Sequence, residues 1–300
     1  MRPQSSHPWL NIVEYPFLTR EFDTGEGWLS YVDHGHGQPI VFVHGSPTWS
    51  YLYRRIIKGL GGLYRCIAPD HLGFGLSEKP IGVDYSPQAQ ARRFANLMDY
   101  LRLKDVTLVA QDCGGPIALA WALEHPDRVR QVVLFNTWMW SLQENRSAQR
   151  LANLVGNPLN RFYYRVLNAS PTFVLPALFA DRHRLPRQSQ VQFLEPFRNF
   201  RERRAIYAMV EGLRDGEAWF EELYARRDEL AHMRALLLWG TKDPLFGVQA
   251  LNRFENMLPL SETVTFPQVG RYVPEEASRM ALEEIRWFLL NQRAFAPYVK

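Results

Sequence analysis

Seven short apolar runs separated by amphipathic stretches constrain the fold of this 300-residue chain more than any other feature of its sequence. Strands that alternate with helices predict an α/β fold, in which helices cover both faces of a mostly parallel sheet. The predicted strands are WLSYVD (28–33), IVFVHG (40–45), YRCIAPD (64–70), VTLVAQD (106–112), VRQVVLFN (129–136), RALLLWG (234–240) and TVTFPQV (263–269).

Polar or glycine-rich turns follow five of these runs, and they read HGSPTW, PDHLGFG, QDCGG, NTW and GTKD. In an open α/β sheet, ligands bind beyond the carboxyl ends of the strands. We therefore expect the five turns, which come from distant parts of the chain, to meet at one edge of the sheet and form an active site.

About a hundred residues between Asn136 and Leu236 contain no convincing strand. The segment is rich in aromatic residues, leucine and arginine, and its prolines divide it into several short helices. No Gly/Ser linker flanks it, which argues against a separate domain. We expect a helical cap at 137–233, inserted into an α/β core domain made of 1–136 and 234–300.

Charge and cysteine content narrow the classes of partner and compartment. The formal charge is +4 with a pI of about 9.1, but the basic residues are dispersed, and the densest stretch (198–204) reads as a solvated helix face. We expect no nucleic-acid binding.

The two cysteines indicate no disulfide framework and a reducing compartment, and no apolar run has the length of a signal peptide or a membrane span. We expect a cytoplasmic protein without metal or cofactor.

Asp112 is the strongest candidate for a catalytic residue. The stretch Ala110-Gln111-Asp112-Cys113-Gly114 follows a strand and opens a helix, which is the small-x-nucleophile-x-small pattern of a nucleophile elbow. A carboxylate at that position needs no deprotonation and attacks electrophilic carbon to form an ester. The alternative is a helix N-cap, for which Asp is well suited. The small flanking residues and the neighbouring polar turns favour the nucleophile.

Three motifs in order resemble those of the haloalkane dehalogenase family. They are HGSPTWSYLYR (44–54), DHLGFGLSEKP (70–80) and the Asp112 turn. Within the family, NTWMW (136–140) and an acid after the following strand resemble the subfamily that includes the β-lactone decarboxylases of bacterial long-chain olefin biosynthesis. The resemblance extends from about residue 14 to residue 292, and it implies an α/β-hydrolase fold with an inserted helical cap.

The resemblance implies further site residues. Asp243, in the turn after RALLLWG, matches the family's catalytic acid, although an aspartate there also suits a turn. The backbone N–H groups of Ser46 and Cys113 are expected to form an oxyanion hole. His44 is expected to support that loop through a hydrogen bond.

Arg271 stands where the family carries its catalytic histidine, in the loop QVGRYVPEE (268–276). Arginine remains protonated and cannot activate water, but as a fixed cation it can stabilise a developing carboxylate or alkoxide. His71, in a neighbouring loop, and His183, in the cap, are the alternative bases, with surface or packing roles as the simpler interpretation.

Halide binding shows a second departure from the family pattern. The family usually holds the leaving halide with a tryptophan after the nucleophile and an asparagine in the oxyanion loop. This chain has Cys113 and Ser46 at these positions. Trp49, Trp138 and Trp140 are the candidates for an indole N–H donor to the ligand, while Trp138 and Trp140 equally suit the core of the cap.

The resemblance implies decarboxylation of a long-chain cis-β-lactone to an alkene and CO2, a net reaction that consumes no water and releases no halide. It also implies an apolar small-molecule substrate and possible association with other enzymes of an olefin-biosynthesis assembly. Three alternatives stay open. They are hydrolytic dehalogenation, epoxide hydrolysis with Tyr163 or Tyr164 paired with Tyr207, and a catalytically inactive binding protein built on a hydrolase fold.

Overall fold

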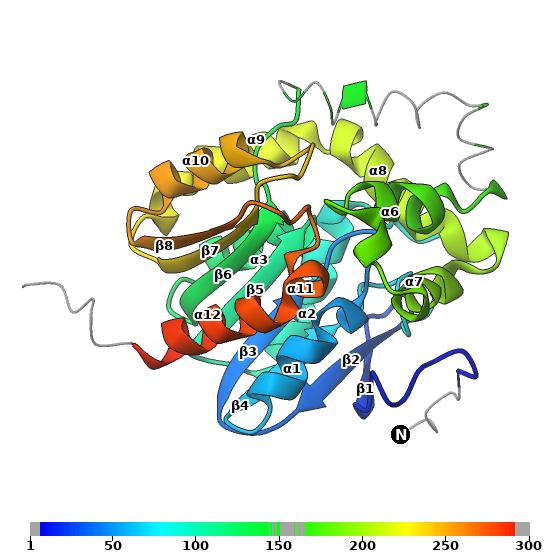
Figure 1. The fold of residues 1–300 in the computed structure, drawn as a ribbon, viewed down its shortest axis with the longest axis horizontal. Helices are drawn as coiled ribbons and strands as arrows, with labels where there is room; N and C mark the ends of the chain where they lie inside the picture. Colours follow the sequence, from blue (N-terminus) through cyan, green and yellow to red (C-terminus); the bar gives the residue numbers. More distant parts are fainter. Residues whose placement is uncertain are drawn as a thin grey trace, which may run out of the picture.

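A computed structural model describes residues 7–143, 145, 147, 149–150, 159, 162 and 166–291. Its centre is an eight-stranded sheet with the order β1-β2-β4-β3-β5-β6-β7-β8 (Figure 1). β1 pairs antiparallel with β2 and β2 with β4, whereas all later pairs are parallel. The strands are β1 (Thr19–Asp23), β2 (Trp28–His34), β3 (Gln38–Val43), β4 (Tyr64–Pro69), β5 (Val106–Asp112), β6 (Val129–Thr137), β7 (Arg234–Gly240) and β8 (Ser261–Phe266).

The α/β fold is confirmed, and each of the seven predicted runs contains a strand. Two strands are shifted by two residues at both ends: β3 lies at 38–43 instead of 40–45, and β8 lies at 261–266 instead of 263–269. The carboxyl ends of β2, β4 and β6 differ from the prediction by one residue. β1 was not predicted, because TREFD at the sheet edge has only exposed or half-buried side chains and hence little apolar signal.

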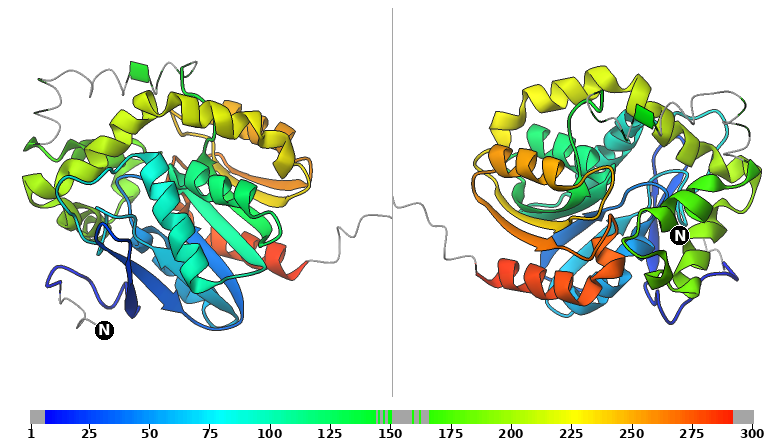
Figure 2. Two further views of the ribbon diagram at one scale, coloured as in Figure 1. Left: turned by 180° about the vertical axis from the view of Figure 1, so that it is seen from behind. Right: turned by 45° about the horizontal axis from the view of Figure 1, so that its top comes forward.

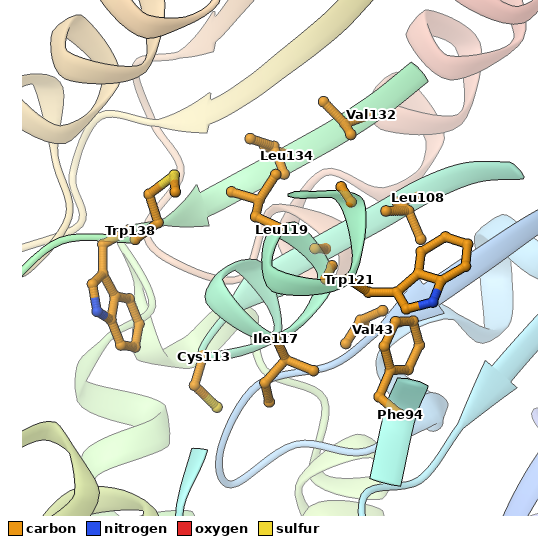
Figure 3. Packing of buried hydrophobic residues seen from close by; sticks show 14 of the residues in the cluster. Val43, Phe94, Leu108, Cys113, Ile117, Leu119, Trp121, Val132, Leu134 and Trp138 are labelled. Atoms are coloured by element: carbon orange, nitrogen blue, oxygen red, sulfur yellow. The ribbon is translucent and has the colours of Figure 1, made fainter. Parts of the chain in front are cut away.

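Alternating side chains of the central strands build two cores, one on each face of the sheet. In β3, Val41 and Val43 join the core under α2 (Pro87–Leu101) and α3 (Gly114–Glu124). Ile40 and Phe42 join the core under α1 (Arg54–Leu60) and α12 (Ser278–Leu290). This period of two explains why the runs are apolar throughout, since both faces are covered. Figure 3 shows Ile117, Leu119 and Trp121 of α3 packed among strand residues of the first core.

Helices α1 (Arg54–Leu60) and α12 (Ser278–Leu290) contact each other on one face of the sheet, and α2 (Pro87–Leu101) contacts α3 (Gly114–Glu124) on the other. The residues of α10 (Val248–Met257) that are buried belong to the same core as α2 and α3. α11 (Val273–Glu276) is a single turn that leads into α12. None of the helices among the described residues is long and apolar enough to cross a membrane.

The described part of the segment between β6 and β7 consists of short helices joined by turns and irregular stretches, and it contains no strand. Figures 1 and 2 show these green and yellow-green helices gathered along one end of the sheet. The helices of this segment with defined bounds are η2 (Ser170–Val174), α6 (Leu175–Ala177), η3 (Arg182–Arg184), α7 (Arg187–Leu194), η4 (Glu195–Phe197), η5 (Phe200–Arg203), α8 (Arg204–Asp215), α9 (Glu217–Ala225) and η6 (Arg227–Leu230). Tyr163 and Tyr164, considered for epoxide chemistry, lie outside the described residues.

Candidate active site

Asp112 lies in the sharp turn between β5 and α3. Its backbone φ is +53°, a left-handed conformation that non-glycine residues seldom adopt. A Cβ at Gly114 would lie 2.2 Å from the carbonyl oxygen of Val43, so this position of the turn requires glycine. The hydroxyl of Thr137 donates to the Asp112 carbonyl at 2.5 Å. The turn therefore has the strained strand-to-helix geometry of a nucleophile elbow.

Two backbone N–H groups hold one oxygen of the Asp112 carboxylate. The N–H of Cys113 donates to Oδ1 at 2.7 Å and that of Ser46 at 3.3 Å. These are the two groups expected to form an oxyanion hole. In this structure their acceptor is the Asp112 side chain itself, so they fix the carboxylate and stabilise its negative charge.

Arg271 lies between the two carboxylates of the site. Its Nη1 donates to Asp112 Oδ2 at 2.8 Å, while Nε and Nη2 donate to the two oxygens of Asp243, each at 3.1 Å. The contact with Asp243 is bidentate, which fixes the plane of the guanidinium group. Arg271 is 4% exposed and both aspartates are 5% exposed. Three residues that sequence analysis selected separately thus form one buried ion-pair cluster.

Burial by itself would lower the pKa of the Arg271 guanidinium, but the carboxylates of Asp243 and Asp112 raise that pKa above its usual value. Arg271 therefore stays protonated and cannot accept a proton from water. Its guanidinium carbon also lies 4.7 Å from the centre of the Phe246 ring, a cation–π contact.

Asn136 is a site residue that the sequence analysis did not select. It is fully buried at the end of β6, and its Nδ2 lies 2.8 Å from the Gly240 carbonyl oxygen and 3.2 Å from Asp243 Oδ2. The N–H of Leu245 donates to Asp243 Oδ1 at 2.9 Å. These contacts orient the carboxylate that holds Arg271. A polar residue directly after a buried apolar run was the available signal.

A cavity of about 590 Å³, including its open mouth, adjoins this cluster. Its apolar wall comes from both the strand-edge loops and the inserted helices, and the polar groups gather around Asp112. No histidine is among the lining residues, which are Ser46, Pro47, Asp112, Cys113, Trp138, Leu142, Ser170, Val174, Leu178, Met209, Val210, Leu245, Phe246, Arg271 and Tyr272.

His44 and His71 join the loops that follow β3 and β4. The N–H of His71 donates to His44 Nε2 at 2.9 Å, which leaves His44 Nδ1 to donate to the Gly45 carbonyl at 2.8 Å. His71 Nε2 lies 3.0 Å from the His44 carbonyl oxygen. Burial lowers the pKa of His71 to about 4 and that of His44 well below its usual value. Both histidines support the loop of Ser46 as neutral side chains.

Several other candidates lie away from the cavity. The expectation that Trp49 contacts substrate is not met, because it is buried in the core and its indole N–H donates to the Gln192 carbonyl at 2.9 Å. Trp140 packs against Tyr224 and Phe254. His183 is exposed. Tyr207, considered for epoxide chemistry, donates to Glu211 at 2.5 Å and does not line the cavity.

The fold agrees with comparisons to known proteins. The family model of the alpha/beta hydrolase fold matches residues 38–278. The chain belongs to the α/β-hydrolase family. Within that family it is haloalkane dehalogenase-like: haloalkane dehalogenase 2 of Mycobacterium tuberculosis (strain ATCC 25618 / H37Rv) is 35% identical to it over 88% of this chain and 92% of the relative.

Two further relatives of this α/β hydrolase match most of its length. The cis-3-alkyl-4-alkyloxetan-2-one decarboxylase of Shewanella oneidensis is 28% identical over 95% of this chain and 92% of its own. The crystal structure of the haloalkane dehalogenase DatA from Agrobacterium tumefaciens C58 superimposes with a TM-score of 0.81 at 27% identity, covering 91% of this chain and 96% of DatA. The relatives carry the names of the two enzyme types that the motifs suggest.

Proposed function

We propose that this α/β hydrolase decarboxylates a long-chain cis-β-lactone to an alkene and CO2, with Asp112 as the nucleophile. The observation that carries the proposal is the position of Arg271 between Asp112 and Asp243. A permanent cation there cannot activate water, and no histidine is among the described residues that line the cavity. Decarboxylation of a β-lactone consumes no water, so it needs no such base.

The first step is attack by Asp112 Oδ2 on the sp³ ring carbon that bears the ring oxygen. A carbon–oxygen bond forms between Asp112 and that carbon, and the bond from the carbon to the ring oxygen breaks. Its electron pair goes to the ring oxygen, which becomes part of a free carboxylate. The protonated Arg271, 2.8 Å from Oδ2 before reaction, can then pair with this new carboxylate.

The second step returns the enzyme to its starting state. The bond between the carboxylate carbon and the adjacent ring carbon breaks and CO2 leaves, while the electron pair forms the carbon–carbon double bond. The ester bond to Asp112 breaks, and its electrons return to the Asp112 oxygen. The N–H groups of Cys113 and Ser46, with Arg271, stabilise this departing carboxylate. The atoms of the lactone are those of the alkene plus CO2, so the net reaction takes up and releases no proton.

The hydrogen bonds of Asp112 favour attack at the sp³ carbon over attack at the lactone carbonyl. Attack at the carbonyl would create an oxyanion on the substrate, yet Cys113 and Ser46 direct their N–H groups to Asp112 Oδ1. That oxyanion would lack the backbone donors that acyl-transfer sites provide. Attack at the sp³ carbon instead releases a carboxylate, which is a stable anion.

The cavity wall supports an apolar substrate. Val174, Leu178, Met209 and Val210 line it from the inserted segment, and their side chains suit alkyl chains. We propose that residues 137–233 form a cap on a core domain made of 1–136 and 234–300, and that this cap covers the alkyl chains. Water is then kept from the Asp112 ester.

The test is incubation of the purified protein with a long-chain cis-β-lactone, followed by measurement of alkene, CO2 and β-hydroxy acid. We expect alkene and CO2 in equal amounts with wild type and none with Asp112→Asn, a nearly isosteric control. Formation of the β-hydroxy acid in place of alkene would show hydrolysis. An intact lactone would contradict the proposal and favour an inactive binding protein.

A second candidate function, dehalogenation, is favoured by Trp138. Its side chain lines the cavity and is 1% exposed, and its indole N–H has no hydrogen-bond partner among the described residues. Such a donor suits a halide. With a brominated alkane, this candidate predicts release of one equivalent of bromide per protein molecule. The alkyl ester on Asp112 should persist, because Arg271 cannot promote its hydrolysis, and mass spectrometry of the intact protein should detect it. Bromide release over many turnovers would exclude the stalled adduct.

A further inference from the structure

The loop that carries Arg271 lies backbone to backbone against the inserted segment. We call residues 267–272, between β8 and α11, the Arg271 loop. The N–H of Arg271 donates to the Leu178 carbonyl at 3.0 Å. A Cβ at Gly270 would lie 2.3 Å from the Leu178 carbonyl oxygen and 2.6 Å from the Ala180 nitrogen. Only glycine permits this approach, so the two backbones are in direct contact.

Glu276 joins the same two segments through its carboxylate. Oε1 accepts the N–H of Gly270 at 3.0 Å, and Oε2 accepts the N–H of Ala180 at 3.0 Å. Ala180 and Glu276 are 96 positions apart in the sequence. One charged side chain therefore satisfies one backbone donor of the Arg271 loop and one of the inserted segment.

Glu276 is well placed for this role because α11 is anchored on its other side. The neighbouring carboxylate of Glu275 is buried and makes two hydrogen bonds to Arg54 of α1, at 2.5 and 3.0 Å. The ring of Tyr272 packs against Phe179, with centroids 5.3 Å apart. These contacts hold the end of α11 against the core and close to the segment around residue 179.

We propose that Glu276 is a positioning residue for Arg271. By fixing the Arg271 loop to residues 178–180, it keeps the guanidinium in contact with both Asp112 and Asp243. Leu178 lines the cavity and accepts the Arg271 N–H, so a displacement of the cavity wall at Leu178 also displaces the backbone of Arg271. The position of the cation between the carboxylates is thus coupled to the position of residues 178–180 of the inserted segment. This coupling rests on the contacts alone, and only its kinetic consequence rests on the proposed function.

The first test is hydrogen exchange in the variant Glu276→Gln. The substitution removes the negative charge and replaces one carboxylate oxygen with an NH2 group, so one of the two backbone N–H groups loses its acceptor. We expect the Ala180 and Gly270 amides to exchange about tenfold faster or more. The Arg271 Nε–H, identified by NMR from its loss in Arg271→Lys, should accelerate likewise, since it bonds to Asp243 only while the loop is in place. Amides of β5 should keep their wild-type rates.

Glu283→Gln is the matched control. The Glu283 side chain on α12 is mostly exposed, and its ion-pair distance to Arg279 is 3.9 Å. This control variant should change none of these rates. An unchanged Arg271 Nε–H rate in Glu276→Gln would overturn the positioning role, even if the two amides accelerate. Equal acceleration of the β5 amides would also overturn it, because it would indicate general destabilisation.

The kinetic consequence is tested with the cis-β-lactone in a double-mutant cycle. Glu276→Gln should lower the rate of alkene release about tenfold in wild type but only slightly in Arg271→Lys, where the bidentate contact to Asp243 is already lost. Equal effects in both backgrounds would contradict action through Arg271. If no variant and no wild-type protein releases alkene, the proposed function fails, and the exchange experiment still decides the role of Glu276.

Discussion

At the scale of single residues, one arginine determines which reactions the site can support. Arg271 makes three hydrogen bonds to Asp112 and Asp243 in a buried position. A histidine in its place could donate to Asp243 and still accept a proton from water, whereas arginine only donates. In the proposed reaction, this cation stabilises Asp112 both as the resting carboxylate and as a leaving group, and it supplies no base for hydrolysis.

The cluster should also contribute strongly to folding stability. Arg271→Met removes the positive charge that lies between two buried carboxylates, so that Asp112 and Asp243 lose their shared ion-pair partner. We expect the free energy of unfolding at neutral pH to fall by about 3–5 kcal/mol, measured by urea denaturation. Arg279→Met, in which the arginine is 88% exposed, should change it by less than about 0.5 kcal/mol. A similar small effect at both positions would show that the cluster is not stabilising.

At the scale of elements, the two loops after β3 and β4 depend on neutral histidines. Folded His71 resists protonation until about pH 4 because burial lowers its pKa, whereas the unfolded chain binds that proton near its usual value of about 6.5. The unfolded state therefore takes up the proton first. The stability contributed by burying His71 is complete above about pH 6.5 and is lost as the pH falls toward 4.

This difference predicts the behaviour of His71→Gln. Between about pH 7.5 and pH 5 the wild type should lose roughly 2 kcal/mol of stability through His71, and the variant should lack that part of the loss. Urea denaturation at both pH values measures it, with exposed His36→Gln as the control. If the variant and wild type lose the same stability, His71 is not buried as a neutral side chain in solution.

At the scale of the whole molecule, the cavity exists because the inserted helices and the strand-edge loops meet over Asp112. Met209 belongs to α8 and lines the cavity, while Asp112 belongs to β5. A larger side chain at Met209 should therefore shorten the space for an alkyl chain without touching the carboxylate cluster.

We accordingly expect Met209→Trp to raise the KM for a long-chain cis-β-lactone about tenfold and to affect a short-chain lactone much less. Overpacking should cost about 1–3 kcal/mol of stability, which urea denaturation measures separately. Phe173→Trp places the same ring on an exposed position of the inserted segment and should leave both KM values unchanged. Equal effects on long and short substrates would contradict this location of the alkyl chain.

The amino-acid sequence by itself determined the alternation of strands and helices, the inserted segment and the Asp112 turn. These features are local: a buried parallel strand is a short apolar run, and an elbow needs small residues next to its nucleophile. Asp243 and Arg271 were selected because their loops resemble those that carry the catalytic acid and the histidine of the haloalkane dehalogenase family. β1 escaped because an exposed edge strand carries little apolar signal.

Only the tertiary structure decided how these residues act together. Arg271 contacts Asp112 across 159 positions of sequence, Asn136 contacts Asp243 across 107, and Glu276 reaches Ala180 across 96. The direction of a side chain at the end of a strand depends on which loops pack beside it, and spacing along the chain does not carry that information. For the same reason Trp49, plausible as a substrate contact in the sequence, is a core residue bonded to Gln192, because packing brings α7 over the loop that follows β3.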